Sequence, residues 1–183
     1  DAAYVRRGLP AGEAMPAVFP LGAGGAALLL RFSVSLPTNA NVVEAYLVLH
    51  RAGLVDDDPA PISLHATRIV EGWEGRSTSW ARLPRLAETR TPSTLVEPGG
   101  PALVRLDVRD LVRQWAKHDP NDHGVAVTAD AESATGTTFA FSRAGADRGF
   151  GSDLNAGPPG VARSNVRPRS APDVEPYLEL YVR

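Results

Sequence analysis

The sequence predicts an all-β protein, an antiparallel jelly-roll-like β-sandwich with one short amphipathic helix at about residues 108–117. Two patterns support this fold class. Short segments with apolar residues at every second position recur along the chain and are separated by Gly, Pro and Asn turns. Only one segment has helical periodicity, so the regular alternation of strands and helices that predicts a parallel sheet is missing. At 183 residues, we expect a single domain over 1–183.

The strands are expected in the following order. Residues 26–34 begin as an apolar run and end in alternation. Residues 42–52 alternate in the way typical of a half-buried strand: one face holds Val43, Ala45, Leu47 and Leu49, and the opposite face holds Glu44, Tyr46, Val48 and His50. Residues 62–70 resume this period after the break "DDDPAP". Later strands are expected at 102–107, 124–129, 137–142 and 177–182.

The helix is predicted from one apolar face. Val108, Leu111, Val112 and Trp115 follow the spacing i, i+3, i+4, i+7, and Asp107 is a suitable N-cap. Such a short helix is unstable alone, so this face should pack onto a sheet. We therefore expect it to fill the core between strands.

Composition limits the classes of partner. The net charge is −2, which gives no general attraction to nucleic acid, and no apolar run approaches the ~20 residues that span a bilayer. Cysteine is absent, which excludes disulfides and thiol chemistry. The chain begins Asp1-Ala2-Ala3 without methionine, and we expect a secreted or cell-surface protein whose signal peptide has been removed.

Six segments carry a family resemblance. In order they are "DAAYVRRG", "LLLRFSVSLPTNANVVEAYLVLH", "EGWEGRSTSW", "VRLDVRDLVRQWAKHDPNDHGVAV", "FAFSRA" and "PYLELYVR". With these segments the chain resembles the disaggregatase-related DNRLRE domains, grouped with family-96 carbohydrate-binding modules, and more distantly the propeptide fold of transforming growth factor β. The resemblance covers almost the full chain. It implies a secreted, non-catalytic β-sandwich from a surface protein or polysaccharide-acting enzyme.

A ligand site is predicted around two tryptophans. Trp73 and Trp80 flank a polar stretch that holds Glu74 and Arg76. Exposed indole rings stack on sugar faces, while carboxylate and guanidinium groups bond hydroxyls. The alternative is that both rings fill the core, because large aromatic side chains are generally well buried.

A calcium site is predicted after the helix. "DPNDHG" resembles the first half of an oxygen-ligand calcium loop, and it offers Asp119, Asn121 and Asp122, with Asp130 further along. One loop supplies too few oxygens for calcium, so a turn that only ends the helix is the alternative. Calcium would be a structural ion here, and no other cofactor is expected.

An assembly surface is the third prediction. Residues 144–175 lack periodicity for about thirty positions, and such long loops are usually functional or disordered. Together with the closing strand they could contact identical subunits, because strand addition is a recurrent assembly mode. The residues concerned are Arg148, Phe150, Arg163, Arg167, Arg169, Tyr177 and Tyr181. An ordinary surface loop and sheet strand are the alternative.

Two functions follow from these features. The first is a non-catalytic exported module that binds extracellular polysaccharide. The second is a structural subunit of an extracellular filament, coat or surface assembly, in which residues 144–175 and the terminal strands contact neighbours. The sequence has no nucleophile elbow, phosphate loop or zinc-ligand spacing, so a polysaccharide lyase or hydrolase is the least supported function.

Overall fold

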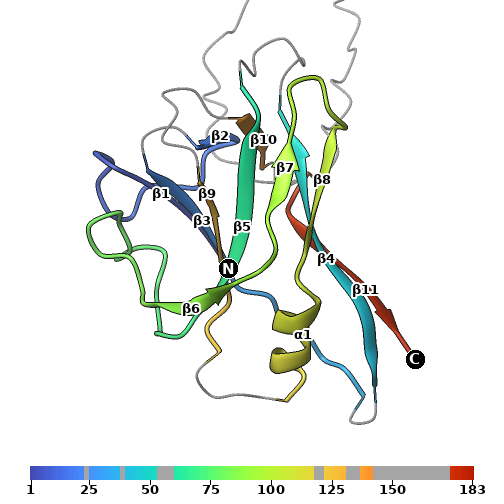
Figure 1. The fold of residues 1–183 in the computed structure, drawn as a ribbon. Coiled ribbons are helices and arrows are strands. Elements are labelled where there is room, and N and C mark those ends of the chain that lie inside the picture. The colour runs from blue at the N-terminus through green and yellow to red at the C-terminus, as the bar shows by residue number, and fades with distance from the viewer. Residues whose placement is uncertain (23–24, 38–39, 53–59, 118–121, 131–136, 142–173) are drawn as a thin grey trace, which may run out of the picture.

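The computed structural model describes residues 1–183 except 23–24, 38–39, 53–59, 118–121, 131–136 and 142–173. In the described part of the chain, eleven strands form two antiparallel sheets, and one helix lies at one end of the sandwich between them (Figure 1). The predicted all-β sandwich with one short helix is therefore confirmed. The jelly-roll path of the chain remains a prediction.

The first sheet has six strands. Its order is β1-β3-β9-β5-β6, and β7 also pairs with β5. The strands are β1 (Ala2–Arg6), β3 (Ala26–Leu30), β5 (Ile62–Ile69), β6 (Leu86–Arg90), β7 (Thr94–Val96) and β9 (Val125–Ala129). Among the central strands, β3 is fully buried, and most residues of β5 and β9 are buried.

The second sheet has five strands. Its order is β11-β4-β10-β2, and β8 also pairs with β4. The strands are β2 (Val18–Leu21), β4 (Val42–Arg51), β8 (Leu103–Asp107), β10 (Thr137–Ala140) and β11 (Tyr177–Val182). The long strand β4 is the centre of this sheet, because it pairs with β8, β10 and β11.

The core lies between the two sheets and follows from the alternation of apolar residues. Leu28 and Leu30 of β3 meet Leu47 and Leu49 of β4 in one buried cluster. Phe19 and Phe139 lie in the same cluster, with ring centroids 6.0 Å apart. The face of β4 that the sequence predicts to be apolar is therefore the face that meets the other sheet.

The helix α1 (Arg109–Trp115) closes one end of this core, as predicted. Val108, Leu111 and Val112 are buried in the main cluster, and Trp115 packs against it. The helix begins at Arg109 and not at 108, and Val108 occupies the cap position. The Asp107 carboxylate accepts a hydrogen bond of 2.9 Å from the Arg109 backbone N–H, so it still binds the first turn.

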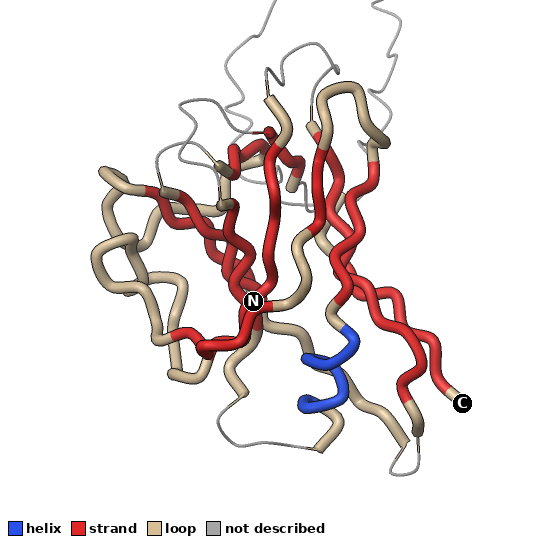
Figure 2. Tube along the Cα trace, viewed as in Figure 1, coloured by secondary structure: helices blue, strands red, loops and turns tan. Residues whose placement is uncertain are grey.

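A second apolar cluster covers the outer face of the six-stranded sheet. Ala27 and Leu29 of β3 point away from the main core and pack with Trp73 and Ile69. The chain between β5 and β6, tan in Figure 2, supplies this cover. As a result, β3 is buried on both faces, and all five of its residues are buried.

The sequence pattern does not predict four of the strands, β1, β2, β6 and β7. β2 is four residues long, contains Pro20 and pairs with β10 at the edge of its sheet, which is where proline is tolerated. β6 is polar and mostly exposed, and β7 has three residues. No helix among the described residues is long and apolar enough to cross a membrane.

Candidate functional site

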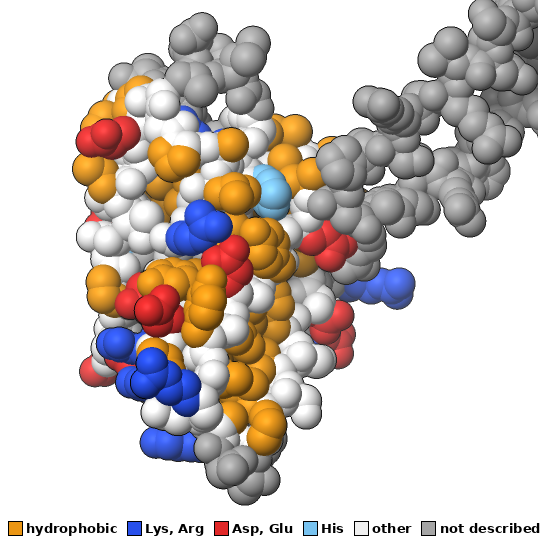
Figure 3. Space-filling view, turned by 90° about the vertical axis from the view of Figure 1, so that its right-hand side faces the viewer, with side chains coloured by type: hydrophobic (Ala, Val, Ile, Leu, Met, Phe, Trp, Pro, Cys, Tyr) orange, Lys and Arg blue, Asp and Glu red, His pale blue; other side chains and the backbone are white. Residues whose placement is uncertain are grey.

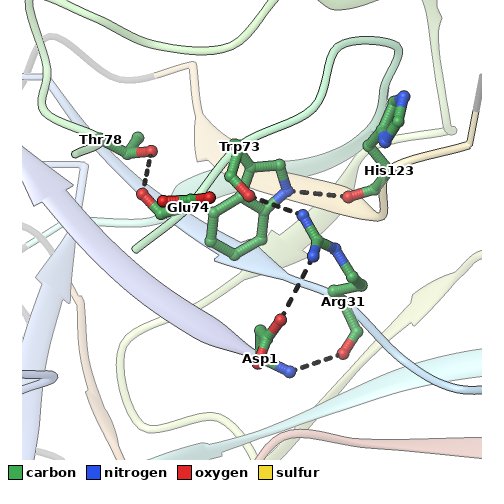
Figure 4. Close-up of polar contacts among 6 residues, drawn as sticks. All are labelled: Asp1, Arg31, Trp73, Glu74, Thr78 and His123. Carbon is green, nitrogen blue, oxygen red and sulfur yellow. Dashed lines mark hydrogen bonds and ion pairs between the residues drawn. The ribbon is translucent and has the colours of Figure 1, made fainter. Parts of the chain in front are cut away.

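Trp73 is a structural residue and does not offer a free ring face. Its side chain is 7% exposed and belongs to the cluster on the outer face of the six-stranded sheet. The indole N–H donates a hydrogen bond of 2.8 Å to the His123 carbonyl. The Arg31 guanidinium lies over the ring, 4.9 Å from its centroid (Figure 4). A sugar ring would have to displace Arg31 before it could stack on this indole.

Trp80 and the polar residues between the tryptophans also serve the local fold. Trp80 is half-buried and packs against the same cluster. Its ring lies so close to Gly25 that a Cβ at this glycine would be 2.7 Å from the ring. The Glu74 carbonyl accepts hydrogen bonds from the backbone of Ser77 and Thr78, which forms a tight turn. The Glu74 and Arg76 side chains are exposed.

An open hollow of about 610 Å³ lies beside Trp73. It is lined by Arg31, Gly72, Trp73, Glu74, Ser77, Asp122 and His123. The hollow therefore brings Trp73 and Glu74 together, whereas Arg76 and Trp80 do not line it. Arg31 is already engaged, because it donates hydrogen bonds to the Trp73 carbonyl at 2.7 Å and the Asp1 carboxylate at 3.3 Å. These polar groups could bind hydroxyls but provide no stacking surface.

The residues predicted to bind calcium do not form one ligand set in the described structure. Asp119 and Asn121 lie outside the described residues. Asp122 accepts a hydrogen bond from the Gly124 N–H, which is the geometry of a turn. Asp130 lies beyond the other end of β9, which has five residues, so roughly 15 Å or more separates the two carboxylates.

Asp130 has other partners. It bonds the ring Nε2 of His65, and its other oxygen lies 3.3 Å from the Arg90 guanidinium. The described residues contain no group of three or more His, Asp or Glu side chains placed to hold a metal ion. The structure thus separates Asp122 from Asp130, and calcium binding by the loop itself stays a prediction.

The predicted assembly residues fall in two parts of the chain. Arg148, Phe150, Arg163, Arg167 and Arg169 lie outside the described residues. Tyr177 and Tyr181 lie on β11, and their exposed fractions are 37% and 54%. These two tyrosines point outward from the five-stranded sheet, because the residues between them, Leu178 and Leu180, pack against the core.

The outward side of β4, β8 and β11 gathers exposed and half-buried aromatic and charged side chains. We call it the tyrosine face and define it by Glu44, Tyr46, Arg105, Asp107, Tyr177, Glu179 and Tyr181. The strand register sets their positions: Glu179 is opposite Tyr46, and Tyr181 is opposite Glu44. Three of the four tyrosines of the chain lie here. Figure 3, viewed from the side of β4 and β11, shows hydrophobic side chains in a band with charged groups beside it.

The polar groups of the tyrosine face are held in defined positions. The Arg105 guanidinium donates two hydrogen bonds to the Glu179 carboxylate, of 3.0 and 3.2 Å. These bonds lower the pKa of Glu179, so the pair stays charged below the usual range of a carboxyl group. The Tyr177 hydroxyl also donates to Glu179. The Glu44 carboxylate raises the pKa of Tyr46, whose hydroxyl donates to it.

The sequence points to Tyr177 and Tyr181 as site residues but not to Tyr46 or Arg105. The available signal was the alternation of β4, which already placed Glu44 and Tyr46 opposite the apolar residues. The strand register could not be predicted from the sequence. Only the pairing of β4 with β8 and β11 joins these residues into one face.

Neither a scan of protein-family models nor a search of the curated proteins finds a match to this chain.

Proposed function

We propose that the chain is a non-catalytic, exported module that binds an extracellular polysaccharide on the tyrosine face. One observation carries the proposal: Tyr46, Tyr177 and Tyr181 share an outward sheet face with hydrogen-bonding charged groups. Exposed tyrosine rings provide apolar area for sugar faces, and the phenol hydroxyls and carboxylates bond sugar hydroxyls. An open sheet face of this kind suits a chain-like ligand better than the polar hollow beside Trp73.

The charges of the tyrosine face favour a neutral polysaccharide. Its charged side chains are the carboxylates of Glu44, Asp107 and Glu179 and the single guanidinium of Arg105. Since Arg105 is already paired with Glu179, the remaining charge of the face is negative. A glycan rich in uronic acid would be repelled, whereas neutral sugars can accept and donate hydrogen bonds to the same groups.

Loss of two tyrosine rings is expected to weaken glycan binding. In native gels loaded with a neutral xylan or β-glucan, the wild-type chain should be retarded, and alginate should retard it less. The double variant Tyr46→Ala/Tyr181→Ala should lose affinity by about a hundredfold, about tenfold or 1.4 kcal/mol per ring. The matched control is Leu95→Ala, an exposed apolar residue on β7 of the other sheet.

Two results would contradict this proposal. One is the absence of retardation by every neutral polysaccharide. The other is equal retardation of the wild-type chain and the double variant, while circular dichroism shows that both are folded.

A second function, a structural subunit of an extracellular filament or coat, is favoured by the exposed strand β11. Tyr181 and Val182 are 54% and 46% exposed at the edge of the sheet. A filament forms when two different surfaces of each subunit contact its neighbours and the repeated contact does not close into a ring. Electron microscopy of the purified chain would show polymers if this second function is correct.

A further inference from the structure

The strand β11 is an open edge in the part of the chain that the structure describes. It pairs on one side with β4 and has no partner among the described residues on its other side. Natural edge strands are usually protected by charged side chains, lysine above all, by proline or by a bulge. Residues 177–181 contain no lysine or proline, their one charged residue, Glu179, is paired with Arg105 of the same chain, and the irregularity in the pairing with β4 comes only after Tyr181.

The exposed edge carries a palindromic sequence. Residues 177–181 read Tyr-Leu-Glu-Leu-Tyr, which is the same in both directions around Glu179. When a strand pairs antiparallel with its own copy about a two-fold axis, residues at equal distances from the axis lie opposite each other. Centred on Glu179, the pairing places Tyr177 opposite Tyr181 and Leu178 opposite Leu180, so each apolar residue meets one of its own type.

We infer that a second copy of this chain pairs with β11, antiparallel and centred on Glu179, to form a two-fold dimer. On the outward face two Tyr177–Tyr181 pairs form, and aromatic cross-strand pairs stabilise sheets. On the inward face two Leu178–Leu180 pairs cover side chains that one copy leaves only partly buried. The five-stranded sheets of the two copies then form one continuous sheet.

The central pair of carboxylates is compatible with this contact. Two Glu179 side chains opposite each other would repel if they stood alone. Each one, however, receives both hydrogen bonds of its own Arg105 on β8, two strands away in the same sheet. The four groups at the axis carry no net charge, and each guanidinium lies beside the junction.

The dimer differs from the filament and does not depend on glycan binding. A two-fold contact uses the same surface on both copies and closes after two subunits. The tyrosine faces of both copies lie on the same side of the joined sheet, because the two-fold axis is perpendicular to it. Where the proposed function holds, the dimer therefore doubles the length of the polysaccharide platform.

A single cysteine tests the pairing directly. The chain has no cysteine, so Glu179→Cys introduces the only thiol. Directly opposed residues of an antiparallel pair have Cα atoms about 4.5–5.5 Å apart, which fits a disulfide. In an oxidised glutathione buffer, Glu179→Cys should double its mass in a non-reducing gel. The exposed control Leu95→Cys should remain monomeric.

Two further variants test the register. Tyr177→Cys or Tyr181→Cys alone should form no disulfide-linked dimer, because position 177 of one copy lies opposite position 181 of the other and the two thiols of each variant lie apart. An equal mixture of the two should form the mixed disulfide. If Leu180→Cys crosslinks and Glu179→Cys does not, the axis lies elsewhere and the palindromic register is wrong.

Sedimentation of the wild-type chain completes the test. It should show a monomer–dimer equilibrium, and removal of the paired apolar groups by Tyr177→Ser/Tyr181→Ser should shift it to monomer. A wild-type chain that stays monomeric at high concentration, together with a Glu179→Cys variant that does not crosslink, would overturn the inference. The test of glycan binding is independent of the test of the dimer. Tyr46→Ala should weaken retardation on neutral polysaccharide, whereas the double variant Glu179→Cys/Tyr46→Ala should still form the disulfide-linked dimer.

Discussion

Replacement of Gly124 by alanine is expected to lower the free energy of unfolding by about 3 kcal/mol or more. Gly124 lies just before β9 with φ +106°, a conformation that side chains with a Cβ rarely adopt. A Cβ built there would be 2.2 Å from the Leu30 carbonyl oxygen, which is backbone and cannot move aside without disturbing β3. The loss is large against the 5–15 kcal/mol that stabilises a typical domain. Urea unfolding followed by tryptophan fluorescence measures it.

Gly8 offers a matched control. It also has a positive φ, +88°, but a Cβ there would have no neighbour within 4 Å. Gly8→Ala should therefore cost only the conformational penalty, about 1 kcal/mol. Equal losses at both positions would show that the contact with Leu30 has no energetic role.

The same glycine clarifies the loop that the sequence marked as a candidate cation site. In the sequence, "DPNDHG" resembles a calcium loop because its glycine follows two oxygen ligands at the expected spacing. In the structure, Gly124 is needed because the chain turns against Leu30, and Asp122 stabilises this turn through the Gly124 N–H. The spacing thus has a structural cause that is independent of calcium.

Much of the fold could be predicted because its strands have strong local patterns. The alternation in β4 separates Leu47 and Leu49 from Tyr46, and the structure keeps this separation. The helix face from Val108 to Trp115 also packs into the core as expected. Short edge elements such as β2 carry no such pattern, because pairing with β10 and not local periodicity makes them strands.

The candidate sites were harder to predict, because they depend on contacts between distant parts of the chain. The burial of Trp73 results from its packing on β3 and the position of Arg31 over its ring, 42 residues away in sequence. The tyrosine face depends on the register that aligns β11 with β4 across more than a hundred residues. Neither the burial of one aromatic residue nor the grouping of the others can be read from local composition.

A charge placed under the helix is expected to be the most damaging substitution in the core. Val112 lies on the inward face of α1 and is fully buried in the main cluster. Val112→Asp would bury a carboxylate in apolar surroundings, at a cost of about 4 kcal/mol or more unless the helix detaches. We expect the variant to unfold at a much lower urea concentration than the wild-type chain, or to accumulate as insoluble protein.

The control is Gln114→Asp on the exposed side of the same helix. It introduces the same charged residue two positions away, in the last turn of the helix, where its carboxylate stays in water, so it should change the free energy of unfolding by only about 1 kcal/mol. A comparable loss in both variants would mean that the helix itself, and not its packing, limits stability. A large difference instead assigns the stabilising role of α1 to the buried face, because the loss of helix propensity and the unfavourable helix dipole both act more strongly on the control, and only burial favours a larger loss at Val112.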